Sequence, residues 1–313
     1  MNCFPLALRR GSGAFPKPVV NFALFSLVLI AAFARPLFDL ASYSLKDDLY
    51  SHTLLVPGVS LYLVWLTRKR LPTTFKAAFG AALVPFLIGA VAVGAYWLTI
   101  HRISGLAQTD YLSLTIFSFV CFLWGGLLCF FGLDAVRMAA FPIGFLIWLV
   151  PFPTSFITGF ETFLQHTSAD AAAALFGLSG ATVFREGLVF HLPGIAIEVA
   201  RECSGIHSSL VLLITSLVAG HLFLRSPWRK TALALAVIPL GIARNGFRIF
   251  TLGTLCVHVS PKIIDSPLHH RGGPIFFALS LVPFLAFLVL LRRWEKPGKT
   301  PMRAPAALPP KNV

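Results

Sequence analysis

The chain has 313 residues, of which 57% are hydrophobic and 12% are charged, and it contains 30 Phe. This composition excludes a soluble domain with a single core, because the apolar surface is too large to be hidden from water. The net charge of +14 does not indicate a nucleic-acid partner, since the basic residues lie at the ends of hydrophobic segments and form no stripe with stacking aromatics.

Eight apolar stretches alternate with short charged loops along the chain. A helix needs about 20 apolar residues to cross the hydrocarbon core of a membrane, and only the second stretch is short. The stretches are 18–38, 53–67, 77–99, 111–132, 138–157, 204–224, 231–257 and 273–291. They predict an all-α polytopic membrane protein with about eight transmembrane helices.

The two ends of the chain differ from the apolar part between them. Residues 1–17 are basic, and the stretch after them lacks a small-residue cleavage site, so we interpret it as a retained first span. Residues 18–294 are predicted to form the transmembrane domain that carries the chemistry. Residues 295–313, rich in Pro, Ala and Lys, are predicted to be a disordered tail.

The distribution of Lys and Arg predicts the orientation. When alternate loops are assigned to opposite sides, one side receives seventeen of these residues and the other receives seven. Arg244 and Arg248 fall inside the seventh span. By the positive-inside rule, both termini of this multi-pass protein are predicted to be cytoplasmic.

The longest connection on the outer side, about residues 153–202, is predicted to form a small cap. Residues 156–177 are Ala-rich and amphipathic, as in a helix. Residues 182–191 and 195–200 are β-rich and flank a Pro-Gly pair, which predicts a β-hairpin. This hairpin leads into Glu202 and Cys203 at the start of the sixth span, although a cap without chemistry is an alternative.

Cys203 is a candidate nucleophile. The sequence predicts it at the outer N-terminus of a helix, where unpaired N–H groups and the helix dipole favour a thiolate. Cys121 and Cys129 lie in the middle of a span and are interpreted as inert packing residues. A disulfide between Cys203 and Cys256 is an alternative in an oxidising compartment.

Three further groups are predicted at the same membrane face. Arg244, Asn245 and Arg248 lie in the outer half of the seventh span, where a charged side chain usually faces a polar interior. Either Arg could hold a thiolate or stabilise an oxyanion. Imidazole groups that could transfer protons are supplied by His269 and His270, just before the eighth span, and by His207, one turn after Cys203.

These residues lie in segments that resemble the exosortase/archaeosortase family. The segments are GLVFHLPGIAIEVARECSGI from residue 187, NGFRI from residue 245 and HHRGG from residue 269. Two earlier segments, YSHTLLVP from residue 50 and FPIGFLIWLVP from residue 141, also resemble that family. All five occur in order, and their predicted membrane placement is the same as in the family.

The resemblance implies a cysteine peptidase and transpeptidase that needs no cofactor. Its substrates would be secreted proteins with a C-terminal sorting signal, a Pro-Glu-Pro-type motif followed by an apolar helix and basic residues. Cys203 would be the nucleophile, Arg248 the thiolate or oxyanion partner and His269 the acid and base. The acceptor of the cleaved protein would be an envelope glycan or lipid.

Two other classes of protein are weighed against this prediction. A transporter would place ionisable groups near the bilayer midplane in related half-repeats, and the sequence contains neither. A non-catalytic assembly protein would need only the fold. A metalloprotease is disfavoured because no HExxH spacing occurs.

Overall fold

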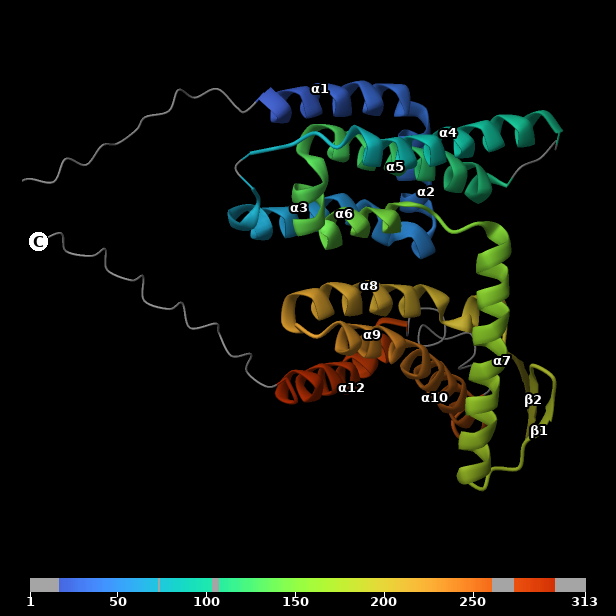
Figure 1. Cartoon of the computed structure of the whole chain (residues 1–313). Helices are drawn as coiled ribbons and strands as arrows, with labels where there is room; N and C mark the ends of the chain where they lie inside the picture. The colour runs from blue at the N-terminus through green and yellow to red at the C-terminus, as the bar shows by residue number, and fades with distance from the viewer. Residues whose placement is uncertain (1–16, 73, 103–106, 261–272, 296–313) are drawn as a thin grey trace, which may run out of the picture. The chain divides into compact units, whose positions relative to one another are not determined.

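The computed structural model describes residues 17–72, 74–102, 107–260 and 273–295 (Figure 1). Within these residues, six helical segments are long and apolar enough to cross a membrane, or up to eight if each of two bent helix pairs is one span. The predicted class, an all-α polytopic membrane protein with a small β element, is confirmed. The chain divides into two compact units, Met1–Ile157 and Thr158–Val313.

The described part of the first unit is helical. Its elements are α1 (Lys17–Ala32), α2 (Ala34–Lys46), η1 (Asp48–Leu54), α3 (Val56–Thr67), η2 (Arg68–Arg70), α4 (Phe79–Arg102), α5 (Gln108–Met138), α6 (Ala140–Phe145) and η3 (Leu146–Leu149). Helix α7 (Thr154–Leu178) begins at the end of this unit, and most of it belongs to the second.

Two helix pairs are sharply bent, and proline accounts for both bends. Helices α1 and α2 meet at 72°, and Pro36 has no N–H to donate to the carbonyl of Ala32. The segment Ala140–Leu149 meets α7 at 91°, across a break that contains Pro151 and Pro153. The spans predicted at 18–38 and 138–157 are therefore interrupted, not straight.

Phenylalanine rings pack onto glycines between helices α1, α4 and α5. A Cβ atom at Gly125 of α5 would lie 2.8 Å from the Phe86 ring of α4, and one at Gly126 would overlap the Phe25 ring of α1. Since the missing side chains make room for the rings, the helices can approach closely at these positions. The abundance of Phe in the sequence has its structural use here.

The second unit combines a helical bundle with a small sheet. Its elements after α7 are β1 (Phe184–Glu186), β2 (Val189–Leu192), β3 (Ile195–Glu198), η4 (Arg201–Ser204), α8 (Ile206–Phe223), α9 (Pro227–Leu235), α10 (Val237–His258) and α12 (Gly273–Arg293). The bundle core joins α8, α9, α10 and α12, and it contains Leu212, Leu233, Val237, Phe284 and Leu288.

The sheet has three antiparallel strands in the order β1-β2-β3, so the predicted two-strand hairpin is incomplete. The segment 182–191, expected as one strand, turns at Gly187 and Leu188 and forms two strands, with Glu186 opposite Val189. The Pro193-Gly194 turn between β2 and β3 is as predicted, with Leu192 opposite Ile195. Pattern alone does not reveal the first turn, because Gly187 is a single glycine in an otherwise β-rich run.

A second apolar cluster fixes the sheet to the helices. It contains Ala172 and Phe176 of α7, Phe190 of β2, Ile249 of α10, and Val199, which follows β3. Figure 1 shows β1 and β2 alongside α7. Because Val199 directly follows β3 and is buried in this cluster, the chain leaves the sheet from a fixed point.

Candidate active site

Cys203 lies in the short 3-10 helix η4, which two residues, Val199 and Ala200, separate from β3. Gly205 follows the turn with a left-handed φ of 73°, which glycine adopts without a steric penalty. The sequence predicts Cys203 at the N-terminus of the long helix itself, whereas Ser204 and Gly205 separate it from Ile206, the first residue of α8. The side chains of Glu202 and Cys203 lie outside what the structure describes.

Arg244 and Asn245 of α10 lie against the residue that follows this turn. The Nη2 atom of Arg244 donates a hydrogen bond to the Gly205 carbonyl oxygen at 3.0 Å and another to Ser209 Oγ at 3.3 Å. A Cβ atom at Gly205 would lie 2.9 Å from Arg244 Nη2 and 3.2 Å from Asn245 Oδ1. The backbone two residues after Cys203 therefore contacts the Asn-x-x-Arg segment.

Gly241 allows helices α8 and α10 to approach closely beside this contact. A Cβ atom at Gly241 would lie 2.7 Å from Ser209 Oγ, so α8 and α10 could not pack as closely with a larger side chain at that position. Gly241 is one turn before Arg244, and Ser209 is one turn after Gly205. The contact between Arg244 and the backbone thus depends on the packing of the two helices.

Arg244 is a buried cation. Its side chain is only 8% exposed, and burial of a guanidinium group is costly unless hydrogen bonds replace water. Among the carboxylates whose positions the structure describes, none forms an ion pair with Arg244, and its Nη1 atom is buried without an acceptor among the described side chains. A positive charge held in this way favours negative charge nearby, such as a thiolate or an oxyanion.

Arg248 follows Arg244 by one helical turn in α10, so the two side chains lie on the same face, as the spacing predicts. Arg248 is half-buried, and Asn245 is fully buried. The structure therefore brings Arg244 and Asn245 to the short segment of residues 200–204, which we call the Cys203 turn. The catalytic role of Arg248 stays a prediction.

The candidate histidines are in different situations. His207 is in the first turn of α8 and is exposed to solvent. His269 and His270 lie outside the described residues, so the choice among the three stays a prediction. Within the described ranges, no three His, Cys, Asp or Glu side chains are grouped to hold a metal ion.

Gln165 of α7 is a buried polar residue that the sequence analysis missed. Its Nε2 atom donates to the Val199 carbonyl oxygen, just before the Cys203 turn, and its side chain is 6% exposed. The residue lies on the same buried stripe as Ala169, Ala172 and Phe176, at helical spacing. A polar residue on the apolar face of a predicted helix is the signal that could have identified it.

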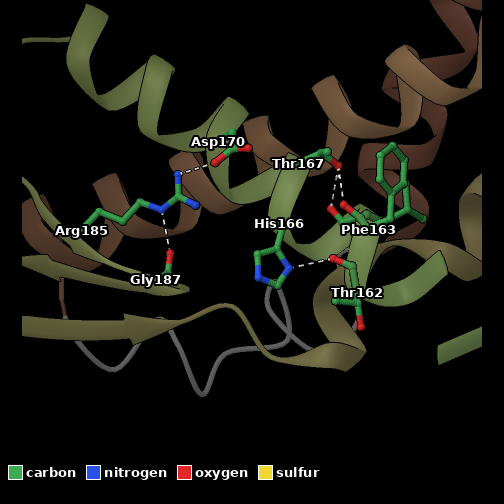
Figure 2. Close-up of polar contacts among 8 residues, drawn as sticks. Thr162, Phe163, His166, Thr167, Asp170, Arg185 and Gly187 are labelled. Atoms are coloured by element: carbon green, nitrogen blue, oxygen red, sulfur yellow. Dashed lines mark hydrogen bonds and ion pairs between the residues drawn. The ribbon is translucent and has the colours of Figure 1, made fainter. Parts of the chain in front are cut away.

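The exposed side of α7 carries polar contacts at the surface, which Figure 2 shows. Arg185 of β1 forms a 2.7 Å ion pair with Asp170 and donates to the Gly187 carbonyl oxygen at 2.8 Å. The ring of His166 hydrogen-bonds the Thr162 carbonyl oxygen of its own helix at 2.9 Å. Exposed pairs of this kind contribute little to stability, and of these contacts the Arg185–Asp170 pair alone joins β1 to α7.

Comparison with known proteins gave one match. Residues 42–286 match the model of the family described as transmembrane exosortase (Exosortase_EpsH). The matched range contains η1, α3 and the break before α7, and it also contains the segments with Cys203, Arg248 and His269. No curated protein and no solved structure matches the chain.

Proposed function

Because this chain belongs to the transmembrane exosortase family, we propose that it is a membrane cysteine peptidase and transpeptidase that cleaves C-terminal sorting signals from secreted proteins. Cys203 is the proposed nucleophile, with Arg248 as its partner and His269 as acid and base. The supporting observation is the contact of Arg244 and Asn245 with Gly205, because it joins the Asn-x-x-Arg segment to the backbone beside Cys203.

The proposed reaction is acyl transfer. The Cys203 thiolate forms a bond to a peptide carbonyl carbon, and the electron pair of the carbonyl moves to an oxyanion held by Arg248. When the oxyanion collapses, the C–N bond breaks, and protonated His269 gives its proton to the leaving amine. The products of this half-reaction are an acyl-enzyme thioester and the released C-terminal segment.

A second nucleophile completes the cycle. An amine or hydroxyl of an envelope glycan or lipid loses a proton to His269 and attacks the thioester carbon, and the Cys203 thiolate leaves. The secreted protein is then joined to the acceptor. With water as the nucleophile, the same steps would yield a free carboxylate.

The membrane contributes to substrate selection in this proposal. The sorting signal includes an apolar helix, which diffuses laterally in the bilayer and presents its cleavage point at the outer surface. The positive-inside pattern supports placement of the active site on the periplasmic side of the inner membrane, with both termini in the cytoplasm.

Replacement of Cys203 by Ala tests the proposal. We expect Cys203→Ala to abolish removal of the C-terminal signal from a co-expressed secreted reporter, while the amount of enzyme in the membrane is unchanged. Mass spectrometry of the reporter's new C-terminus measures the result, and an added mass distinguishes transfer from hydrolysis.

Cys129→Ala is the matched control. Cys129 lies in the apolar helix α5 of the first unit and has no proposed role, so this variant should process the reporter normally. Full processing by Cys203→Ala would refute the proposal and favour a non-catalytic assembly or transport protein.

A further inference from the structure

The Cys203 turn is held by a buried side chain on each side. Before it, Gln165 of α7 donates to the Val199 carbonyl oxygen; after it, Arg244 of α10 donates to the Gly205 carbonyl oxygen. Five residues, 200–204, lie between the two bonded carbonyls. Both donors are buried and come from different helices.

Val199 and Gly205, the two anchors of the turn, each also form a backbone–backbone hydrogen bond. The N–H of Val199 donates to the Leu188 carbonyl oxygen at 3.0 Å, which ties Val199 to the sheet. The Gly205 carbonyl also accepts from the N–H of Ser209 at 3.0 Å, the first helical bond of α8. Each anchor is therefore fixed to its own element as well as to α7 or α10.

The two helices that supply the donors are packed against one another. A Cβ atom at Gly246 of α10 would lie 2.6 Å from the Cβ of Ala171 and 3.1 Å from the backbone nitrogen of Ala172, both in α7. Ala169, Ala172 and Ile249 share one apolar cluster. Gln165 and Arg244 therefore come from two helices that contact one another.

We propose that Gln165 and Arg244 are positioning residues that hold the Cys203 turn between them, an inference that rests on the proposed function. Each donates to a backbone carbonyl oxygen, so each acts by restricting where the turn can move. A misplacement of about 1 Å can reduce an enzymatic rate by about a hundredfold, and without either side-chain donor the turn is held at that end by its own backbone hydrogen bond alone.

The hydrogen-bonding groups of the two side chains explain why Gln and Arg suit these positions. A buried Gln amide has two N–H donors, and a neutral donor can satisfy the Val199 carbonyl without adding charge to the apolar cluster. Arg244 donates to both Gly205 and Ser209, so a single side chain joins the turn to the first turn of α8. Leu in place of Gln165 would fit the apolar stripe but would leave the carbonyl unsatisfied.

The test uses the full-length enzyme with Gln165→Met, which keeps the length of the side chain and removes the donor. We expect hydrogen exchange to accelerate at residues 199–206 and to stay unchanged in the bundle helices. With a secreted reporter that ends in a Pro-Glu-Pro motif, an apolar helix and basic residues, kcat should fall about tenfold to a hundredfold with KM unchanged. A purely structural role would lower the yield of folded enzyme without changing kcat per molecule.

Thr162→Val is the control on the same helix, since Thr162 is exposed and its hydroxyl bonds its own helix. Arg244→Lys should retain more of kcat than Arg244→Met, because Lys still supplies a charged donor. The double variant Gln165→Met with Arg244→Met should cost less than the two single effects combined, since both release the same turn.

The results separate this inference from the proposed function. If Cys203→Ala abolishes processing while Gln165→Met leaves both exchange at 199–206 and kcat unchanged, the positioning role is refuted and the proposed function stands. If Cys203→Ala processes the reporter, the proposed function fails, and accelerated exchange in Gln165→Met then reports a structural tie alone.

Discussion

The two ends of α8 hold charged groups in different ways. At its C-terminal end, Glu295 accepts hydrogen bonds from the N–H groups of Arg225 and Ser226, both at 2.7 Å. Arg229 lies 3.6 Å from the same carboxylate and donates to the Trp294 carbonyl oxygen at 2.8 Å. The carboxylate of Glu295 lies near the positive start of α9, and the charge of Arg229 beside it is of the opposite sign, so this arrangement is electrostatically favourable.

At the N-terminal end of α8, Arg244 is buried and donates hydrogen bonds to two neutral oxygens, the Gly205 carbonyl and Ser209 Oγ. Among the acids whose side chains the structure describes, none is paired with Arg244. The comparison shows two uses of a charged group: at one end an ion pair joins two segments of the chain, and at the other end a guanidinium group holds a backbone carbonyl. The two ends should therefore respond differently to mutation.

The largest effect that separates the two ends is expected for Arg248→Ala. If Arg248 stabilises the oxyanion, removal should lower kcat by about 10² to 10³, as for other oxyanion donors, with little change in the unfolding temperature. Arg248→Lys should recover only part of the rate, because an ammonium group lacks the planar fork of a guanidinium. Reporter processing measures both, and an unchanged rate in Arg248→Ala would assign the role elsewhere.

Gly205→Ala should affect both stability and activity. The left-handed φ of 73° and the 2.9 Å approach of Arg244 Nη2 leave no room for a Cβ atom. We expect a loss of about 1–3 kcal/mol in the free energy of unfolding together with reduced processing. Gly144→Ala is the control, because a Cβ there meets no atom within 4 Å; equal stability of the two variants would contradict the prediction.

Glu295→Ala should affect stability alone. It removes the acceptor for two backbone N–H groups at the start of α9, and loss of a helix cap typically costs about 1 kcal/mol. Thermal unfolding in detergent measures the loss, and Glu295→Gln should lose less because its amide oxygen still accepts. A fall in kcat per folded molecule would show that the two ends are coupled.

The smallest effect is a pH dependence at the same end. The pKa of Glu295 is lowered from its ordinary value of 4.5 by the hydrogen bond from the Ser226 N–H, with the Arg225 N–H and the charge of Arg229 adding to it and partial burial opposing it. The stabilisation is therefore complete above the ordinary pKa and is lost as pH falls through the lowered one. The difference in unfolding temperature between wild type and Glu295→Gln should shrink below about pH 4, and a constant difference would contradict this assignment.

Much of the architecture follows from local pattern. The apolar stretches, the helix at 156–177 and the Pro193-Gly194 turn were predictable because span length, helical periodicity and turn chemistry are properties of neighbouring residues. The bends were less accessible, since hydropathy passes smoothly over Pro36 and over Pro151 although the backbone does not. The turn at Gly187 was not predicted, because a single glycine inside a β-rich run does not by itself indicate a turn.

The sequence by itself determined the membrane class, the family resemblance and the candidate catalytic residues, Cys203 and Arg248 among them, because composition and motif spacing are written along the chain. Only the tertiary structure decided that Gln165 and Arg244 bind the carbonyls on either side of Cys203. Those bonds join residues 34 and 39 positions apart. They depend on how closely α7, α8 and α10 pack, and no periodicity within one helix encodes that distance.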